Sequence, residues 1–507
     1  MTHKRLNDAL YWCACALLLA VVACGMTRPL LQIGRYVPLD PNEGWNAYFG
    51  EAAVHGGVLY PPAAALITNN YPPLSFYIVG AVGHLMGDNI FAGRVIALLS
   101  LLFVTWSIYY WLRSSGSAMR IGLLAALTFL AYAVTYGRDY VAMDDPQWLA
   151  HAIMMAGLLV LWRGKDETRH IVLAAVLMMA AGWTKHLLIP LPLAASAWLL
   201  WRSRPAFAKW ALSLAVSLAI ACALAWWLHG PRLFESLHEP RQYMRWKATA
   251  QATAALRVFF PLIVLWVVAL ARDRLSERLG FVSVYLVISG GVAVFAAGGA
   301  GVDVNSFFDV LIAGCLAAGL AVEILWHPNA NSRTVATGRV RTTGPVPTAG
   351  PTAGPTPLFW GSAAALALAI FIVSYTVTIA PSQIAKIHSI DADEQTALQD
   401  IEVIRLGSHG RAACEMLDLC YWAKSAFMVD FFYFGQKLKT GVLPKSACAD
   451  AFERGDISMV QLESNPRYRA KLLPTDCDEL ITAQYHPIRQ SSFGPLLVRP
   501  GVTTSRN

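Results

Sequence analysis

The sequence predicts an all-α polytopic membrane protein with about eleven transmembrane helices, followed by a small mixed α/β domain at the C-terminus. Of the 507 residues, 56% are hydrophobic and only 14% are charged, whereas soluble domains carry about 25% charged residues. Apolar runs recur along residues 1–381, most of them near the ~20 residues that a helix needs to cross a bilayer. Residues 382–507 turn polar, with mixed helical and extended patterns, and are expected to form the second domain.

Eleven apolar windows define the predicted spans. They cover residues 9–27, 92–112, 121–136, 147–162, 170–184, 187–201, 210–228, 256–271, 279–298, 307–325 and 358–380. Lys4 and Arg5 precede the first window, which we interpret as an uncleaved span rather than a cleaved signal peptide. With a cytoplasmic N-terminus, five loops become cytoplasmic and each holds at least two Lys or Arg residues, as the positive-inside rule requires. These are residues 113–120, 163–169, 202–209, 272–278 and 333–341.

The short apolar stretch 74–86 is predicted to be an interfacial or re-entrant helix. It holds only 13 residues, and counting it as a span would place the basic loops outside. Residues 329–357 are rich in Thr, Gly and Pro and are predicted to form a flexible cytoplasmic linker. The outer face then receives the long loop 28–91, several short turns and the C-terminal domain.

Cysteine usage supports this orientation. The C-terminal domain holds four cysteines, Cys414, Cys420, Cys448 and Cys477, which predict two disulfides in an oxidising compartment. Three pairings are open, and the rival zinc site lacks a Cys-x-x-Cys element. We therefore expect an integral protein of the bacterial inner membrane, with its N-terminus in the cytoplasm and its C-terminal domain outside. The net charge of +8 arises from short loops between apolar runs, which does not indicate nucleic acid.

Unusual polar residues gather in two outer loops. Carboxylates near lipid are costly, so acids retained at several span ends on one face indicate a shared polar cavity. Asp145 precedes Pro146, and a role as helix cap would by itself explain its presence. Asp144 has no such structural explanation. The first loop reads Asp40-Pro41-Asn42-Glu43-Gly44-Trp45, then Gly56-Gly57-Val58-Leu59-Tyr60 and Tyr71-Pro72-Pro73-Leu74, and the second reads Arg138-Asp139-Tyr140 and Asp144-Asp145-Pro146.

The order of these motifs resembles the GT-C superfamily of polyprenyl-phosphate-sugar glycosyltransferases. The most similar branch is the one of protein O-mannosyltransferases, aminoarabinose transferases and Rgt-like enzymes. The resemblance covers roughly residues 1–325 and leaves out the C-terminal domain. It implies a membrane glycosyltransferase that moves a sugar from a polyprenyl-phosphate donor to a lipid, glycan or protein acceptor at the outer face, with inversion.

The resemblance also implies a general base in the first loop. The family carries an adjacent Asp-Glu there, whose Asp activates the acceptor hydroxyl. This sequence departs from the pattern, because Asn42-Glu43 occupies that place and Asp40 lies two residues upstream. The base is therefore Glu43 or Asp40, with Glu43 favoured by position, and Asp144 is expected to position the acceptor or the base.

Further residues complete the predicted site. By resemblance Lys185 holds the donor phosphate, and the other candidate cations are Arg138 and the cluster Arg241, Arg245 and Lys247. Snorkelling of Lys185 to the interface is its alternative role. In the Gly-rich loop 298–309, Asn305 and Asp309 are placed to contact the sugar or acceptor, although a plain interhelical turn is equally compatible. The predicted substrate-binding set is Asn42, Tyr71, Asp145, His186 and Asn305.

No cofactor is required by this chemistry. A divalent cation held by Asp40, Glu43 and Asp144 is one alternative use of the acids. A membrane transporter or lipid flippase that uses them for ion coupling is the rival function. The acids lie at span ends on one face rather than near the midplane, and no inverted repeat is evident, which opposes the rival. A common catalytic site requires 40–43, 144–145 and Lys185 to converge.

Overall fold

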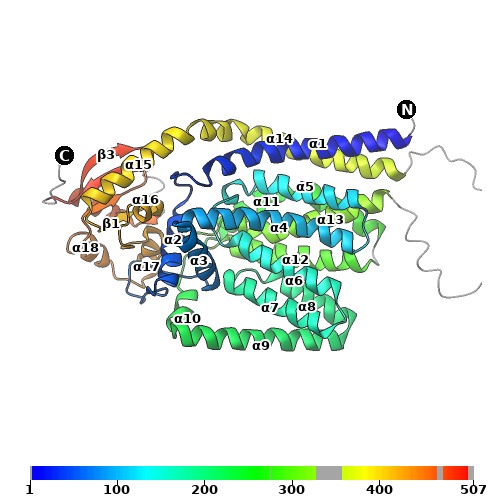
Figure 1. The fold of residues 1–507 in the computed structure, drawn as a ribbon, viewed down its shortest axis with the longest axis horizontal. Coiled ribbons are helices and arrows are strands. Elements are labelled where there is room, and N and C mark those ends of the chain that lie inside the picture. Colours follow the sequence, from blue (N-terminus) through cyan, green and yellow to red (C-terminus); the bar gives the residue numbers. More distant parts are fainter. Residues whose placement is uncertain (1–2, 274–275, 327–356, 465–471, 501–507) are drawn as a thin grey trace, which may run out of the picture.

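The computed structural model describes residues 3–273, 276–326, 357–464 and 472–500. A bundle of long helices fills one end of the molecule, and a smaller domain with a β-sheet lies at the other (Figure 1). The bundle consists of α1 (His3–Gln32), α4 (Asn89–Ser114), α5 (Met119–Thr135), α6 (Gln147–Arg163), α7 (Thr168–Thr184), α8 (Pro190–Arg202), α9 (Arg204–His229), α11 (Arg245–Arg272), α12 (Glu277–Ala297), α13 (Phe308–Trp326) and α14 (Pro357–His388).

Each of the eleven predicted spans falls on one of these helices. Seven of the helices in the described ranges, α1, α4, α9, α11, α12, α13 and α14, are long and apolar enough to cross a membrane. The other four, α5 to α8, have only 13 to 17 residues, fewer than the ~20 of a perpendicular span. The chain is thus an integral membrane protein, and the count of eleven spans is not confirmed.

Burial orders the bundle around α13. Inside the molecule, 83% of the most apolar window of α13 is buried, against 6% for α9. In Figure 1, α9 lies on the outside of the bundle, whereas α1 and α14 lie side by side along the opposite edge. A helix that is apolar all round is expected at the centre of a bundle or in contact with lipid. Helix α13 therefore lies at the centre of the bundle and α9 at its periphery.

Between the bundle and the sheet domain lie short helices of the outer loops. They are α2 (Pro41–Val54), α3 (Leu74–Met86), α10 (Arg232–Leu237) and the 3-10 turns η1 (Arg138–Tyr140) and η2 (Val304–Phe307). The stretch predicted to be interfacial is α3, which has 13 residues and ends at Gly87, in the left-handed conformation with φ 83°. It packs closely on α2, because a Cβ at Gly80 would lie 2.3 Å from the carbonyl oxygen of Gly50. The N-cap of α2 is Asp40.

The C-terminal part forms a four-stranded sheet with helices around it. Its strands are β1 (Ala412–Cys414), β2 (Met459–Gln461), β3 (His486–Ser491) and β4 (Gly494–Val498), in the order β1-β2-β4-β3, with β1 and β2 parallel and the other pairs antiparallel. Its helices are α15 (Ile390–Gly407), α16 (Leu417–Trp422), α17 (Phe431–Thr440), α18 (Ala447–Phe452) and α20 (Thr475–Gln484). The mixed α/β composition agrees with the predicted fold class.

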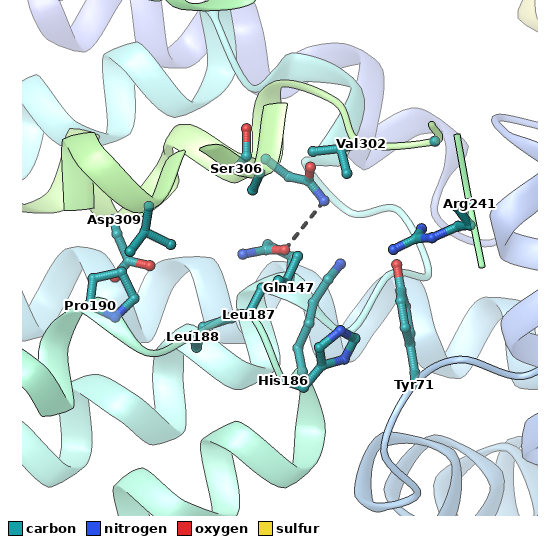
Figure 2. Close-up of a pocket in the computed structure, with 15 residues that line it drawn as sticks. Tyr71, Gln147, His186, Leu187, Leu188, Pro190, Arg241, Val302, Ser306 and Asp309 are labelled. Carbon is teal, nitrogen blue, oxygen red and sulfur yellow. Dashed lines mark hydrogen bonds between the residues drawn. The ribbon is translucent and has the colours of Figure 1, made fainter. Parts of the chain in front are cut away.

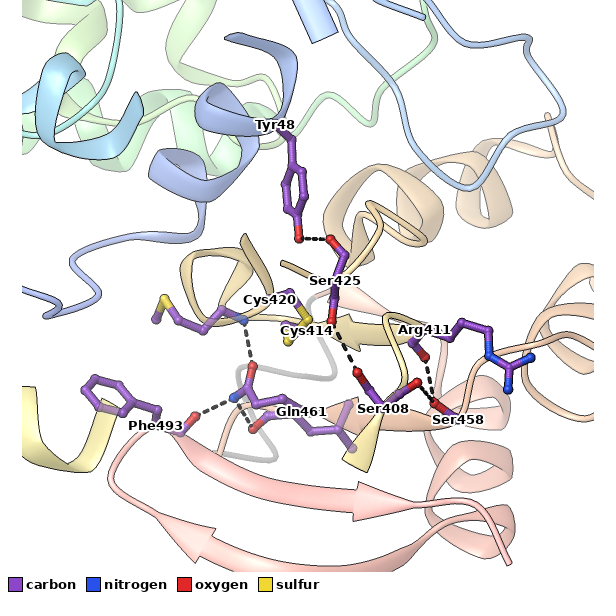
Figure 3. The surroundings of a disulfide bond; sticks show 11 residues. Tyr48, Ser408, Arg411, Cys414, Cys420, Ser425, Ser458, Gln461 and Phe493 are labelled. Carbon is purple, nitrogen blue, oxygen red and sulfur yellow. Dashed lines mark hydrogen bonds between the residues drawn. A yellow bond between two sulfur atoms is a disulfide. The ribbon is translucent and has the colours of Figure 1, made fainter. Parts of the chain in front are cut away.

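Two disulfides link the four cysteines of this domain, as the sequence predicts. The pairs are Cys414–Cys420 and Cys448–Cys477. Figure 3 shows the first pair close to α2, whose Tyr48 hydroxyl donates to the carbonyl oxygen of Ser425 at 2.9 Å. The predicted boundary at 381–382 falls inside α14, which continues through Pro381 to His388. Except for residue 357, the predicted linker 329–357 lies outside the described residues.

Candidate active site

A buried ion pair anchors the first outer loop. Arg94 of α4 and Glu43 of α2 are both 0% exposed, and Arg94 Nε and Nη2 donate to the two Glu43 oxygens at 2.8 and 2.6 Å. The other guanidinium hydrogens go to the backbone carbonyls of Gln32, Arg35 and Val37. Glu43 Oε1 also accepts the backbone N–H of Asp144 at 2.9 Å. Both oxygens of Glu43 are therefore occupied in holding the two outer loops together.

Asp40 is placed differently from Glu43. Its Oδ1 caps α2 by accepting the backbone N–H of Asn42 at 2.9 Å, and its Oδ2 makes no hydrogen bond to any residue in the described ranges. Burial, and then the charges of Glu43, Asp145 and Asp303, raise the pKa of Asp40 to about 7. A partly buried carboxyl with one free oxygen and a pKa near neutrality has the properties of a general base.

The acidic pair of the second loop points in two directions. Asp144 packs against α4, where a Cβ at Gly93 would lie 1.9 Å from Asp144 Oδ1. Asp144 Oδ2 is buried and has no hydrogen-bond partner in the described part of the chain. Burial, followed by the charges of Glu43 and Asp145, raises the pKa of Asp144 well above its usual value. Burial therefore favours the protonated form of Asp144.

Asp145 turns the other way, to Lys185 at the end of α7. Lys185 Nζ donates to Asp145 Oδ1 at 2.9 Å and lies 4.9 Å from the ring centroid of Tyr71. Burial, the largest single influence, lowers the pKa of Lys185, but the charges and hydrogen bonds of Asp145 and Tyr71 together outweigh it and leave that pKa above its usual value. The acids of the two loops and the predicted phosphate-binding lysine thus form one continuous set of contacts.

Lys185 also lines a pocket of about 650 Å³, a volume that includes the part of the pocket open to solvent. The predicted residues Tyr71, His186 and Asn305 line it as well. Figure 2 shows the Tyr71 hydroxyl pointing towards Arg241, another lining residue. Burial, and then the charges of Arg241 and Lys185, lower the pKa of His186 to about 4. His186 is therefore neutral at pH 7, and Lys185 and Arg241 are the cations of this pocket.

Three predicted residues lie away from this pocket. Arg138 in η1 faces Asp139 at 3.7 Å, Arg245 is exposed at the start of α11, and Asn42 is exposed on α2. Arg241, a member of the same predicted cluster as Arg245, does line the pocket. Asp40 and Glu43 do not line it either, but the contacts of Asp144 and Asp145 connect their loop to it.

The C-terminal domain supplies residues that sequence reasoning did not select. Asp418 of α16 is 0% exposed, and its Oδ1 accepts the backbone N–H of Gly44 at 2.7 Å. Phe432 of α17 packs against Gly301 of the pocket wall, where an added Cβ would lie 2.6 Å from the Phe432 ring. Gly301 has φ +76°, so this wall needs glycine for two reasons. The domain therefore covers part of the site.

A sequence signal existed for one residue that was missed. Arg94 is a charge within the apolar run 92–112, and such a charge is retained only with a partner or a function. Nothing comparable marks Asp418, which lies outside the region of family resemblance. Over the described residues, no group of three or more His, Cys, Asp or Glu side chains is arranged to hold a metal ion. The cation considered for Asp40, Glu43 and Asp144 has no such cluster there.

Fold and site together define a class, a polytopic membrane protein with a polar pocket between the loops that are predicted to be outer and with a disulfide-bonded C-terminal domain. Residues 68–296, under half of the chain, match the model of a 6-pyruvoyl-tetrahydropterin synthase related domain, described as a membrane protein. No curated protein sequence matches the chain.

The fold is shared with two crystal structures of ArnT from Cupriavidus metallidurans. The apo structure aligns over 94% of this chain and 97% of its own, with a TM-score of 0.57 and 13% identity. The structure bound to undecaprenyl phosphate aligns over 96% and 99%, with a TM-score of 0.59 and 13% identity. The predicted fold class, a GT-C-like helical membrane domain with a small α/β C-terminal domain, is confirmed.

Proposed function

We propose that the protein is a glycosyltransferase that moves a sugar from a polyprenyl phosphate to an acceptor hydroxyl at the outer face of the membrane. The observation that carries this proposal is the convergence of Asp40, the Glu43–Arg94 pair, Asp144, Asp145 and Lys185 beside one pocket. The similarity in fold to ArnT bound to undecaprenyl phosphate supports the class of donor. We also propose that the acceptor is a lipid, a glycan or a protein. The proposed branch of the superfamily is the one named above by resemblance.

Asp40 is assigned as the general base in place of Glu43. Asp40 Oδ1 caps α2 and Oδ2 is free, whereas both oxygens of Glu43 accept from Arg94. Asp40 takes the proton of the acceptor hydroxyl, and the acceptor oxygen bonds to the anomeric carbon. The bond from that carbon to the phosphate oxygen breaks with its electron pair, and polyprenyl phosphate leaves. Attack from the face opposite the leaving group inverts the configuration.

Lys185 and Arg241 are assigned to the departing phosphate. Negative charge grows on the phosphate oxygen as the bond breaks, and cations already held beside the pocket stabilise that charge without having to reorganise. Asp145 keeps Lys185 charged and oriented through the 2.9 Å contact. The Glu43–Arg94 pair and Asp144 are assigned as positioning residues. Both oxygens of Glu43 are occupied where it joins the two loops, and the Asp144 side chain is buried against Gly93 of α4.

The test is a transfer assay with the purified, full-length protein in lipid nanodiscs. Polyprenyl phosphates carrying labelled pentoses or hexoses are supplied together with a lipid-glycan extract. We expect the wild-type protein to transfer one of the sugars and Asp40→Asn to lower the rate by about 10²–10⁴-fold, the usual contribution of a general base. Absence of transfer from every donor, or a wild-type rate in Asp40→Asn, would overturn the proposal.

A further inference from the structure

The two ends of the pocket differ in charge. Figure 2 shows Tyr71 and Arg241 at one end and Asp309 beside Pro190 at the other, with Gln147 between them. All of these residues line the pocket. A phosphate bound at the cationic end would keep away from the carboxylate of Asp309, because like charges repel. The acidic end therefore receives a different part of the ligand.

Asp309 is held in place but not saturated. It lies in the first turn of α13 and is 7% exposed. The hydroxyl of Tyr285, on α12, donates to Asp309 Oδ1. Asp309 Oδ2 faces His151 Nε2 of α6 at 3.6 Å, which is too long for a hydrogen bond. Within the described ranges, His151 Nε2 is buried and has no hydrogen-bond partner.

The contacts of the other ring nitrogen of His151, Nδ1, place one proton on it. Nδ1 lies 2.8 Å from the backbone carbonyl oxygen of Gln147, a contact that requires a proton on Nδ1 because a carbonyl oxygen only accepts. The contact from Nδ1 to the Gln147 side-chain nitrogen is longer, at 3.3 Å. Nε2, the ring nitrogen that faces Asp309, is therefore the one whose hydrogen bonding is left open. His151 Nε2 and Asp309 Oδ2 thus face each other without a hydrogen bond, and buried polar atoms left in this way are costly until a ligand supplies a partner.

We propose that Asp309 and His151 form a recognition site for a hydroxyl group of the donor sugar, an inference that rests on the proposed function. A sugar hydroxyl has one hydrogen to donate, so it can bond to Asp309 Oδ2 or to His151 Nε2, and its oxygen can still take a hydrogen bond from a neighbour. Gln147 is such a neighbour, and its Oε1 is already occupied by Asn305 Nδ2 at 3.3 Å. The Gln147 amide N–H groups can therefore donate to the hydroxyl oxygen.

The proposal is tested by binding rather than turnover. The probes are polyprenyl phosphate alone, polyprenyl phosphates carrying a pentose or hexose, and matched derivatives that each lack one ring hydroxyl. Hydrogen bonds to charged groups predict that one deoxy derivative binds the wild-type protein about 10–100-fold more weakly than its parent. In Asp309→Asn the parent should weaken by a similar factor, and the deoxy derivative should then bind as well as the parent.

Binding of polyprenyl phosphate without a sugar distinguishes a failure of the hydroxyl site from a failure of the proposed function. Polyprenyl phosphate alone should bind wild type and Asp309→Asn equally, which also shows that the variant is folded. Glu323→Gln is the matched control, because Glu323 lies at the other end of α13, paired with Arg278, and its binding should equal wild type for every probe. If Asp309→Asn does not fold, His151→Leu should show the same loss of discrimination.

Three outcomes would each contradict a different part of this scheme. Unchanged discrimination between parent and deoxy sugars in Asp309→Asn would overturn the hydroxyl site and leave the proposed function intact. Tighter binding of an amino sugar than of its hydroxyl counterpart would replace the hydroxyl by a cationic group. Failure of polyprenyl phosphate to bind the wild-type protein would instead overturn the proposed function.

Discussion

Among single residues, the Glu43–Arg94 pair has the clearest energetic consequence. Both side chains are fully buried, and removing one partner of such a pair costs about 3–5 kcal/mol, because the other charge stays buried without compensation. We therefore expect Glu43→Gln to lower the temperature of thermal unfolding of the purified protein strongly. Glu51→Gln on the same helix is the control, since Glu51 is 54% exposed in its pair with His55. Equal unfolding temperatures for the two variants would contradict the structural role of Glu43.

Asp40 gives the reaction a predictable dependence on pH. Its pKa is raised to about 7, first by burial, and a general base must be ionised to act. The ionised fraction falls as the pH drops through 7, so the transfer rate under saturating donor should be about tenfold lower at pH 6 than at pH 8. Initial rates between pH 5.5 and 8.5 measure this. A rate that is flat across the range, or that rises towards acid, would exclude Asp40 as the base.

The choice between these two acids shows where sequence reasoning stops at this scale. The spacing of Asp40 and Glu43 identified the loop that holds the acids, but position alone favoured Glu43. What separates them is the occupation of their oxygens, and the partner that occupies Glu43 is Arg94, 51 residues away. The pair of His151 and Asp309, 158 residues apart, was equally out of reach. Each needed three-dimensional contacts between separate helices.

Among elements, the docking of α16 on α2 leaves no room for a side chain at Gly44. A Cβ at Gly44 would lie 2.3 Å from the backbone carbon of Leu417, so Gly44→Ala must push the two helices apart. Overpacking of this kind typically costs about 1–3 kcal/mol. We expect lower thermal stability together with reduced transfer, since Asp418 accepts from the Gly44 N–H. Gly290→Ala on α12 has nothing within 4 Å of the added carbon and should behave as wild type.

The sequence predicted the positions of the helices better than their lengths. Apolar windows located a helix at every predicted span, because lipid requires backbone hydrogen bonds to be satisfied within the segment. They also located α3 and its end before Gly87. The windows did not reveal that α8 has only 13 residues, because apolar loop residues such as Leu187 and Leu188 extend the run without being helical. Nor did they show that α14 continues past Pro381.

On the scale of the whole molecule, the orientation in the membrane is the property to measure. The predicted topology puts residues 329–357 in the cytoplasm and the C-terminal domain outside. An alkaline phosphatase reporter, which is active only where disulfides can form, should be inactive when fused after residue 345 and active when fused at the C-terminus. The opposite pattern would place the two disulfides in a reducing compartment and reverse the sidedness of the proposed reaction.

The contact between Asp418 and Gly44 joins residues 374 positions apart, and this has a consequence for the making of the protein. Chains emerge from the ribosome N-terminus first, so α2 and its Glu43–Arg94 anchor are available early, while α16 arrives only near the end of synthesis. Until then the first outer loop lacks its covering domain, and the pocket wall at Gly301 lacks Phe432. A nascent or truncated chain should therefore be unable to consume lipid-linked sugar, and activity should begin only when the last domain has crossed the membrane and closed over the first loop.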